Sequence, residues 1–205
     1  MDLIHAPIFA TNRHRINIDG KGVVTLVCFG GCPLSCRYCI NRAHCFDRSK
    51  WHDSTPEQLY EELRVDNLYF LATCGGVTFG GGEPLLQTDF IVRFRQLCGE
   101  EWKINLETSL NVPTEKLTPL LDIADNWIVD IKDMNPAIYK AYTGVDNSKV
   151  IKHLQLLADS GKAPQTRVRI PLIKEYNTDS DRQASIRQLQ EMGFADFDEF
   201  EYVIK

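Results

Sequence analysis

The most informative eight residues of this 205-residue chain are Cys32-Pro33-Leu34-Ser35-Cys36-Arg37-Tyr38-Cys39. Three cysteines with C-x3-C-x2-C spacing offer three thiolates, one fewer than a closed [4Fe–4S] cluster takes. A metal centre with an open coordination position is typical of a reactive site rather than a structural one. The motif therefore predicts a cluster with one iron free to bind another molecule.

A closed four-cysteine site, with zinc or a cluster, is the alternative, because Cys28 extends the spacing to C-x3-C-x3-C-x2-C. Thiolates suit both kinds of centre. Cys28 ends a predicted apolar strand, however, so we expect its side chain to pack within that strand. We expect the same buried, apolar role for three further cysteines, Cys45, Cys74 and Cys98.

The composition is that of an ordinary globular chain, with 43% hydrophobic and 25% charged residues. The net charge of −5 and the lack of a long basic block argue against a nucleic-acid partner held by phosphate contacts. No apolar run is long enough to predict a membrane helix, and Met1–His5 do not resemble a signal peptide. Seven cysteines in such a chain indicate a reducing compartment, so we expect a cytoplasmic protein.

Short apolar runs alternate with amphipathic segments along the chain. The runs predict six strands buried on both faces, Val23–Cys28, Gly76–Phe79, Ile104–Glu107, Trp127–Ile131, Arg167–Ile170 and Phe200–Ile204. The segments predict five helices, of which one opens with a capping box at Thr55 and Gln58, one is capped by Thr88, and the others are Pro113–Ala124, Ser148–Ser160 and Thr178–Met192.

This alternation predicts a single α/β domain, residues 1–205, built on a parallel sheet with right-handed crossovers. A doubly wound sheet and a partial (β/α)6 barrel both fit. In either fold, functional residues gather at the carboxyl ends of the strands. The sequence places there the cysteine loop, Gly80-Gly81-Gly82-Glu83, Glu107-Thr108, Asp130 and Lys132.

Two motifs together resemble the radical SAM superfamily, namely Cys32-x3-Cys36-x-Tyr38-Cys39 and, about forty residues later, Gly81-Gly82-Glu83-Pro84. Three stretches are similar to the activating enzymes of glycyl radical enzymes: Cys39–Arg42, Gly76–Leu85 and Asp130–Met134. The resemblance covers Asp19 to Pro171. It implies a radical SAM core, a partial (β/α)6 TIM-like barrel of parallel strands with the cluster loop at residues 32–39.

The resemblance implies that Cys32, Cys36 and Cys39 ligate a [4Fe–4S] cluster whose fourth iron binds S-adenosylmethionine. Cleavage by one electron would give a 5′-deoxyadenosyl radical, which would take a hydrogen atom from a glycine of a partner glycyl radical enzyme. The electron donor would be a flavodoxin or a ferredoxin, in an anaerobic cytoplasm. The implied contacts to S-adenosylmethionine are Tyr38 at the adenine, Gly81, Gly82 and Glu83 at the amino group, and Lys132 and Arg169 near the carboxylate and ribose.

The resemblance also implies a monovalent cation beside the cofactor carboxylate, held by Glu107, Thr108 and Asp130. This chain has Glu107-Thr108-Ser109-Leu110 where the family usually has Asp-Thr-Asn-Gly. It has no additional C-x2-C pair between Cys39 and Gly80, which predicts a single cluster. It ends just after the sixth predicted strand, where better-known activases continue to a histidine. A six-stranded barrel stays open on one side, where we expect a loop of another protein to enter.

Two other functions fit the same residues. One is a different small radical SAM enzyme that acts on a peptide, a nucleoside precursor or a metabolite. The other, from a different class, is an iron–sulfur or zinc protein that carries electrons or structure without catalysis. The second leaves the open coordination position and Gly81-Gly82-Glu83 without a purpose.

Overall fold

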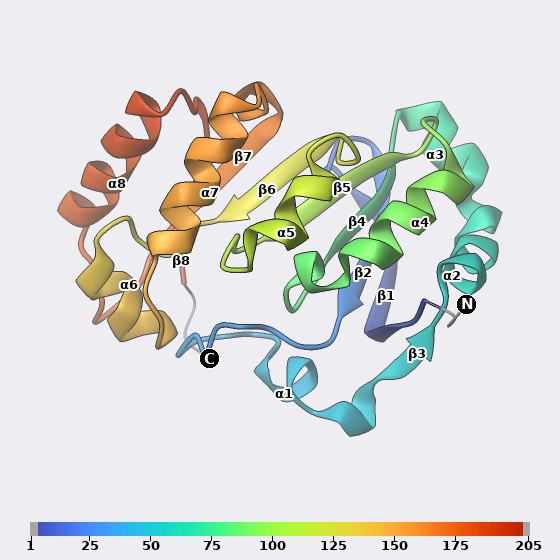
Figure 1. The fold of residues 1–205 in the computed structure, drawn as a ribbon, viewed down its shortest axis with the longest axis horizontal. Coiled ribbons are helices and arrows are strands. Elements are labelled where there is room, and N and C mark those ends of the chain that lie inside the picture. The colour runs from blue at the N-terminus through green and yellow to red at the C-terminus, as the bar shows by residue number, and fades with distance from the viewer. Residues whose placement is uncertain (1–3, 203–205) are drawn as a thin grey trace.

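The computed structural model describes residues 4–202, which form one eight-stranded sheet in the order β3-β1-β2-β4-β5-β6-β7-β8 (Figure 1). Six strands, β2 and β4 to β8, run parallel to one another, and β1 is antiparallel to both β2 and β3. The strands are β1 (Ala6–Ile16), β2 (Val23–Phe29), β3 (His52–Ser54), β4 (Gly76–Gly81), β5 (Lys103–Thr108), β6 (Asn126–Asp130), β7 (Thr166–Leu172) and β8 (Asp196–Glu201). The predicted parallel sheet is confirmed.

The described residues form eight helices, of which all but α1 pack against one face of the sheet; Figure 1 shows α4, α5 and α7 in front of the strands and α1 apart, below their ends. They are α1 (Arg42–Cys45), α2 (Pro56–Leu63), α3 (Asn67–Thr73), α4 (Thr88–Cys98), α5 (Thr114–Leu117), α6 (Pro136–Thr143), α7 (Ser148–Asp159) and α8 (Asp179–Glu191). Five 3-10 turns complete the described elements: η1 (Arg48–Lys50), η2 (Arg64–Asp66), η3 (Pro84–Gln87), η4 (Thr118–Leu120) and η5 (Ala163–Gln165). Within residues 4–202 the end strands β3 and β8 do not pair, so the sheet is open, as a partial barrel requires.

Both faces of the sheet are buried at its centre, as expected, but they differ in character: the face toward the helices is apolar, whereas the other face carries polar side chains beside apolar ones such as Val24 and Ile128. In β5, Ile104 and Leu106 are fully buried in the core against the helices. Between them Asn105 faces the other way, because side chains alternate along a strand. Its amide donates to Thr78 Oγ1 at 3.0 Å and accepts from Asn126 Nδ2 at 2.8 Å. A ladder of polar side chains therefore crosses the helix-free face, which corresponds to the barrel interior.

The helix predictions are confirmed in part. Complete capping boxes begin α2 at Thr55 and α8 at Thr178. The predicted cap at Thr88 is wrong, because Thr88 is the first residue of α4 and its hydroxyl donates to two carbonyl oxygens. The predicted helix Pro113–Ala124 is broken into α5 and the 3-10 turn η4, which contains Pro119.

The sixth parallel strand begins at Asp196, four residues earlier than predicted, and Val203 and Ile204 lie outside the described residues. Two strands and three helices escaped prediction altogether, β1, β3, α1, α3 and α6. In residues 4–202, no helix combines the length and apolar character that crossing a bilayer demands.

Candidate functional site

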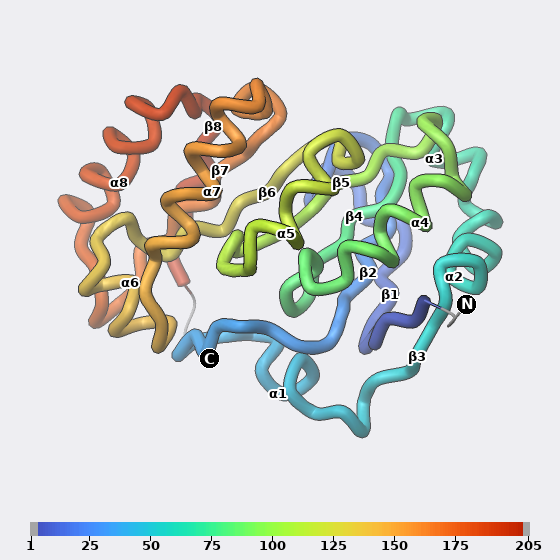
Figure 2. Tube along the Cα trace, in the orientation of Figure 1, coloured from blue at the N-terminus to red at the C-terminus, as the bar shows by residue number. Residues whose placement is uncertain are grey.

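The loop that carries the three cysteines leaves the end of β2 and crosses the ends of the neighbouring strands toward α6 (Figure 2). Its first part is bonded to the glycine turn that follows β4. Gly82 N donates to Phe29 O and Glu83 N donates to Gly31 O, each at 2.9 Å. Asn41 Nδ2, at the far end of the loop, donates to Gly81 O at 2.8 Å. The two sequence motifs therefore lie side by side.

Only glycine fits this junction at two positions. A Cβ on Gly82 would lie 2.1 Å from Gly31 O, far inside contact distance. Gly81 has φ +88°, and a Cβ there would lie 2.6 Å from the Cα of Cys28. Glycine tolerates both the left-handed backbone and the close approach. The glycines are thus required to bring the cysteine loop against β4.

The middle of the loop is held by α6. Ser35 N donates to Thr143 O at 2.9 Å and Arg37 N donates to Tyr142 O at 3.2 Å. The Tyr38 ring packs against Tyr142 and Tyr176 at centroid distances of 5.9 and 5.8 Å, and Tyr142 packs against Tyr202 at 5.9 Å. Tyr38 is therefore part of a tyrosine cluster, which we define as Tyr38, Tyr142, Tyr176 and Tyr202.

The loop cysteines differ from the others in exposure. Cys32, Cys36 and Cys39 are half-buried, whereas Cys28, Cys45 and Cys98 are buried, as expected. Cys74 corrects the expectation, because it is exposed at the left-handed end of α3. Burial raises the pKa of the Cys36 thiol to about 11, against the opposing charge of nearby Lys132. In the described part of the chain, no three His, Cys, Asp or Glu side chains are grouped around a point where one metal ion would sit.

The Glu83 side chain is fully buried and directed into the protein. Its Oε1 accepts from Thr108 Oγ1 at 2.6 Å and from Leu85 N at 3.2 Å. Its Oε2 accepts from the backbone N and the Oγ of Ser109, at 3.0 and 2.6 Å. Burial raises the pKa of this carboxyl, although these hydrogen bonds oppose the rise. The carboxylate fixes the turn after β4 to the end of β5.

Charged side chains at the ends of β5, β6 and β7 form a second group on the helix-free face. Arg169 Nη1 donates to Glu107 Oε1 at 2.5 Å, and Lys132 Nζ donates to Asp130 Oδ2. Lys132 Nζ also donates to Tyr202 Oη at 2.7 Å. Burial has the largest single effect and would lower the pKa of Lys132, but the charges of Asp130, Tyr202 and Cys36 together outweigh it and raise the pKa well above its ordinary value. Lys132 is therefore a buried cation held between Asp130 and Tyr202.

Six buried side-chain polar atoms within residues 4–202 have no hydrogen-bond partner, and three of them lie in or beside this group: Asp130 Oδ1, Arg169 Nε and Tyr142 Oη. Arg169 Nε lies 3.5 Å from Asp198 Oδ2, close enough for an ion pair but without hydrogen-bond geometry. Buried polar atoms in native proteins are nearly always bonded, so such orphans indicate a missing partner. Asp130 Oδ1 can accept a hydrogen bond, Arg169 Nε can donate one, and the Tyr142 hydroxyl can do either. These atoms suit a ligand with both a positive and a negative group, as an amino acid has.

The structure does not bring the Thr108 hydroxyl to Glu107 and Asp130, which corrects the predicted cation site. Adjacent residues of a strand point to opposite faces. Thr108 is 2% exposed and its hydroxyl donates to Glu83, on the helix side of the sheet. Glu107 faces the open side, where it contacts Arg169. The carboxylates of Glu107 and Asp130 remain on the predicted face.

Sequence reasoning missed three residues of this site, Ser109, Tyr142 and Tyr202. Ser109 follows the predicted Glu107-Thr108 pair, and its polar side chain beside a buried carboxylate was a readable signal. Tyr142 and Tyr202 lie on α6 and just after β8, elements that were missed or misplaced. No local pattern in the sequence connects them to the cysteine loop.

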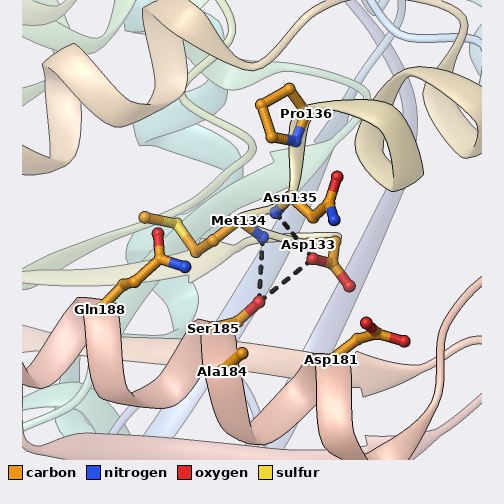
Figure 3. A pocket seen from close by; sticks show the side chains of 8 residues that line it. All are labelled: Asp133, Met134, Asn135, Pro136, Asp181, Ala184, Ser185 and Gln188. Carbon is orange, nitrogen blue, oxygen red and sulfur yellow. Dashed lines mark hydrogen bonds between the residues drawn. The ribbon is translucent and has the colours of Figure 1, made fainter.

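A separate pocket of 280 Å³ lies between the segment after β6 and helix α8 (Figure 3). Ser185 Oγ, on α8, joins the two sides of the pocket: it accepts a hydrogen bond from Met134 N at 3.0 Å and donates one to Asp133 Oδ1 at 3.2 Å. Asp133 also accepts from Asn177 Nδ2 at 3.1 Å. These bonds fasten α8 to the sheet, and the pocket contains none of the predicted site residues.

Comparison with known proteins gives a consistent result. The chain is 35% identical to the (2S)-3-sulfopropanediol dehydratase activating enzyme of Klebsiella oxytoca, over 84% of this chain and 73% of that protein. It is 29% identical to the pyruvate formate-lyase 2-activating enzyme of Escherichia coli, over 83% of this chain and 68% of that protein.

Among solved structures, Streptococcus suis SuiB bound to S-adenosylmethionine matches with a TM-score of 0.66 at 16% identity, over 84% of this chain. This chain spans 38% of that protein, and the likeness shows the fold alone. The Radical SAM superfamily model matches residues 26–189, from within β2 into α8. With this match over most of its length, the chain belongs to the radical SAM superfamily.

Proposed function

We propose that this chain activates a glycyl radical enzyme by taking a hydrogen atom from one of its backbone glycines. The proposal rests on one observation: the matches to named activating enzymes cover most of this chain and most of each relative. The matches to the sulfopropanediol dehydratase and pyruvate formate-lyase activating enzymes extend over more than four fifths of this chain. They also take in more than two thirds of each relative.

As a radical SAM enzyme, the chain uses a [4Fe–4S] cluster and S-adenosylmethionine. We assign the cluster to Cys32, Cys36 and Cys39, which are half-buried free thiols on one loop. Three thiolates leave the fourth iron free for the cofactor. When bound, the two groups supply a 5′-deoxyadenosyl radical after one-electron cleavage of the sulfonium.

The residues at the carboxyl ends of the strands suit S-adenosylmethionine. Its methionine part carries an ammonium and a carboxylate, and the open face offers carboxylates and cations in adjacent pairs. The proposal assigns Lys132 and Arg169 to the carboxylate and ribose hydroxyls, which the positive charges of both side chains on this face support. The ammonium is assigned to backbone carbonyl oxygens of Gly81, Gly82 and Glu83 rather than to the Glu83 carboxylate, which already accepts four hydrogen bonds within the chain. Tyr38, which precedes Cys39 in the loop, is assigned to the adenine.

A monovalent cation would rest on the carboxylates of Glu107 and Asp130. Hard cations prefer oxygen ligands, and Asp130 Oδ1 has no partner among the described residues. Thr108 can contribute only its backbone carbonyl, since its hydroxyl is bonded to Glu83.

The open sheet suits a bulky substrate. The helix-free face is lined by polar side chains and bounded by the unpaired outer edge of β8 within residues 4–202. A glycine-bearing loop of the partner enzyme can reach this face from the side. We further propose that residues 1–205 act as one domain in the cytoplasm and that a flavodoxin or ferredoxin supplies the electron.

The proposal is tested in two steps with protein reconstituted without oxygen. Dithionite and S-adenosylmethionine should yield 5′-deoxyadenosine, and Cys36→Ala should yield none. Incubation with candidate glycyl radical enzymes should then give the EPR doublet of a glycyl radical. Formation of 5′-deoxyadenosine without that doublet on any candidate would favour the alternative of a small radical SAM enzyme with another substrate. No 5′-deoxyadenosine from a fully loaded protein would refute both.

A further inference from the structure

Arginine side chains in and after the cysteine loop lack the carboxylate partners that most other arginines of the protein have. Eight of the twelve arginines in residues 4–202 lie within 4.0 Å of a carboxylate oxygen. The other four are Arg37, Arg42, Arg48 and Arg187. Three of these four fall within twelve residues of sequence, directly after the second cysteine of the loop.

This segment has the opposite charge to the whole chain. Residues 37–50 carry four basic side chains and one acidic one, whereas the chain has a net charge of −5. All four basic residues, Arg37, Arg42, Arg48 and Lys50, are exposed. The acidic residue, Asp47, lies 3.8 Å from Lys50 Nζ, and exposed pairs of this kind bind weakly. The positive charge is therefore available at the surface.

The centre of the segment is apolar. Ile40, which follows Cys39, is 85% exposed, and Phe46 is 45% exposed. Arg42 Nη2 lies back along the loop and contacts the carbonyl oxygens of Ser35 and Cys36 at 3.5 and 3.4 Å. In Figure 1, α1 lies at the outer margin of the molecule, beneath the cysteine loop. Exposed Ile40 and three exposed arginines without a carboxylate partner thus lie in the segment that contains Cys39 and directly follows Cys36.

We propose that this basic loop face, defined as Arg37, Ile40, Arg42, Arg48 and Lys50, is the docking surface for an acidic one-electron donor protein. Electron-transfer partners form small, short-lived interfaces, and opposite charges guide them together. The face needs only to bring the donor's cofactor near Cys36 and Cys39. The helix-free face of the sheet stays open for the substrate.

This docking role rests on the cluster assigned to Cys32, Cys36 and Cys39. In the transfer, a reduced flavin or iron–sulfur donor is oxidised by one electron and the cluster is reduced by one electron. No bond forms or breaks in the protein. The positive side chains raise the local concentration of an acidic donor and orient its cofactor toward the loop.

The test compares two reductants on the reconstituted holoprotein. Cluster reduction is followed by stopped-flow absorbance with fully reduced flavodoxin as the probe, and separately with photoreduced 5-deazariboflavin, a small molecule that needs no docking surface. The test variant is the double substitution Arg37→Glu and Arg48→Glu. The matched control is Arg187→Glu, which reverses an exposed unpaired arginine on α8.

We expect the double variant to be reduced by flavodoxin about tenfold more slowly than wild type, with a weaker dependence on salt. Reduction by deazaflavin should be unchanged, and Arg187→Glu should match wild type with both reductants. Calorimetry with oxidised flavodoxin should show weaker binding to the double variant and to Ile40→Ser, a readout that needs no turnover.

Equal flavodoxin rates and affinities in the double variant and the control would overturn the proposal. So would an equal fall with both reductants, which would mean that the arginines support the cluster rather than a donor. Normal reduction with a lower yield of glycyl radical would assign the face to the substrate enzyme instead. A wild-type protein that binds flavodoxin through this face but forms no 5′-deoxyadenosine would refute the proposed function and leave the docking surface standing.

Discussion

The backbone carbonyl of Leu110 accepts a hydrogen bond from Nδ1 of His153 at 2.9 Å. Leu110 occupies the position where the activating enzymes usually have glycine, and its φ is +58°. A left-handed backbone costs a residue with a Cβ about 1 kcal/mol. The strain is offset by His153, by the bond from Leu110 N to Thr108 Oγ1 at 2.9 Å, and by full burial of the leucine side chain. The departure from the family pattern is therefore accommodated by α7.

Replacing two left-handed residues by glycine should have opposite effects on stability. Leu110→Gly relieves about 1 kcal/mol of strain but removes a buried leucine, and such deletions cost about 2–5 kcal/mol, so the free energy of unfolding should fall. Cys74→Gly relieves the same strain at an exposed position with φ +54°, so the free energy of unfolding should rise by about 1 kcal/mol. Urea titration of both variants measures the difference. A stabilised Leu110→Gly would mean that its side chain contributes little to the core.

The ion pair between β1 and η2 should make stability depend on acid pH. Arg13 donates to Asp66 Oδ2 and Oδ1 at 2.6 and 2.5 Å, and these bonds hold the pKa of the fully buried carboxyl below its usual range. A lowered folded-state pKa gives stability that is complete above the unfolded value of about 3.9 and is lost as the pH falls through the folded value. Asp66→Asn should therefore cost about 2 kcal/mol at pH 7 and progressively less below about pH 4.

The matched control for Asp66 is Glu61→Gln, which removes an exposed pair with Arg64. Such pairs contribute about 0.5 kcal/mol, so its effect should be small at every pH. Urea titrations of the three proteins at pH 7 and pH 3 give the comparison. A cost of Asp66→Asn that does not change between the two values would contradict the assignment.

Much of the fold follows from local patterns, but its first strand does not. The six parallel strands have apolar runs, and the capping boxes at Thr55 and Thr178 mark helix starts directly. β1 contains Arg13, His14 and Arg15, which hide it from a search for apolar runs. Its place in the sheet depends on pairing with β2, a contact that the residues of β1 do not encode by themselves.

The candidate site was predictable where a sequence motif indicates both a site residue and the strand end that lies beside it. The cysteine loop and the glycine turn meet as expected, because adjacent parallel strands end at one edge. The placement of Thr108 beside Glu107 could have been rejected from the sequence, since neighbours in a strand face opposite ways. The contact of Tyr202 with Lys132 spans seventy residues and arises only from the order of strands in the sheet.

A methyl group on Gly82 should displace the cysteine loop. The added Cβ would meet Gly31 O at 2.1 Å and Cys45 Sγ at 2.8 Å, and a backbone oxygen cannot move without the loop. Gly82→Ala should therefore lose about 1–3 kcal/mol of stability and bind less iron on reconstitution. Gly161→Ala is the control for iron content, because no atom lies within 4 Å of the new Cβ; its own backbone, at φ +71°, should cost about 1 kcal/mol of stability without any loss of iron. Full iron content in Gly82→Ala would show that the close packing of loop and turn is dispensable.

The hydroxyl of Tyr202 should set the affinity for S-adenosylmethionine through Lys132. It accepts a hydrogen bond from Lys132 Nζ at 2.7 Å, and the ring lies 5.4 Å from the same ammonium. Tyr202→Phe keeps the ring but frees the ammonium to turn wholly toward Asp130, away from the proposed carboxylate of the cofactor. A hydrogen bond to a charged group contributes about 1.5 kcal/mol, so Kd for S-adenosylmethionine should rise about tenfold. KM for S-adenosylmethionine should rise with it while kcat changes less, a split that mere loss of folding would not produce.

Tyr176→Phe removes a hydroxyl from the same tyrosine cluster and should leave Kd unchanged, because no hydrogen bond of that hydroxyl exists among the described residues. Equal affinities in the two variants, measured by calorimetry on reconstituted protein, would mean that Lys132 holds its position without Tyr202.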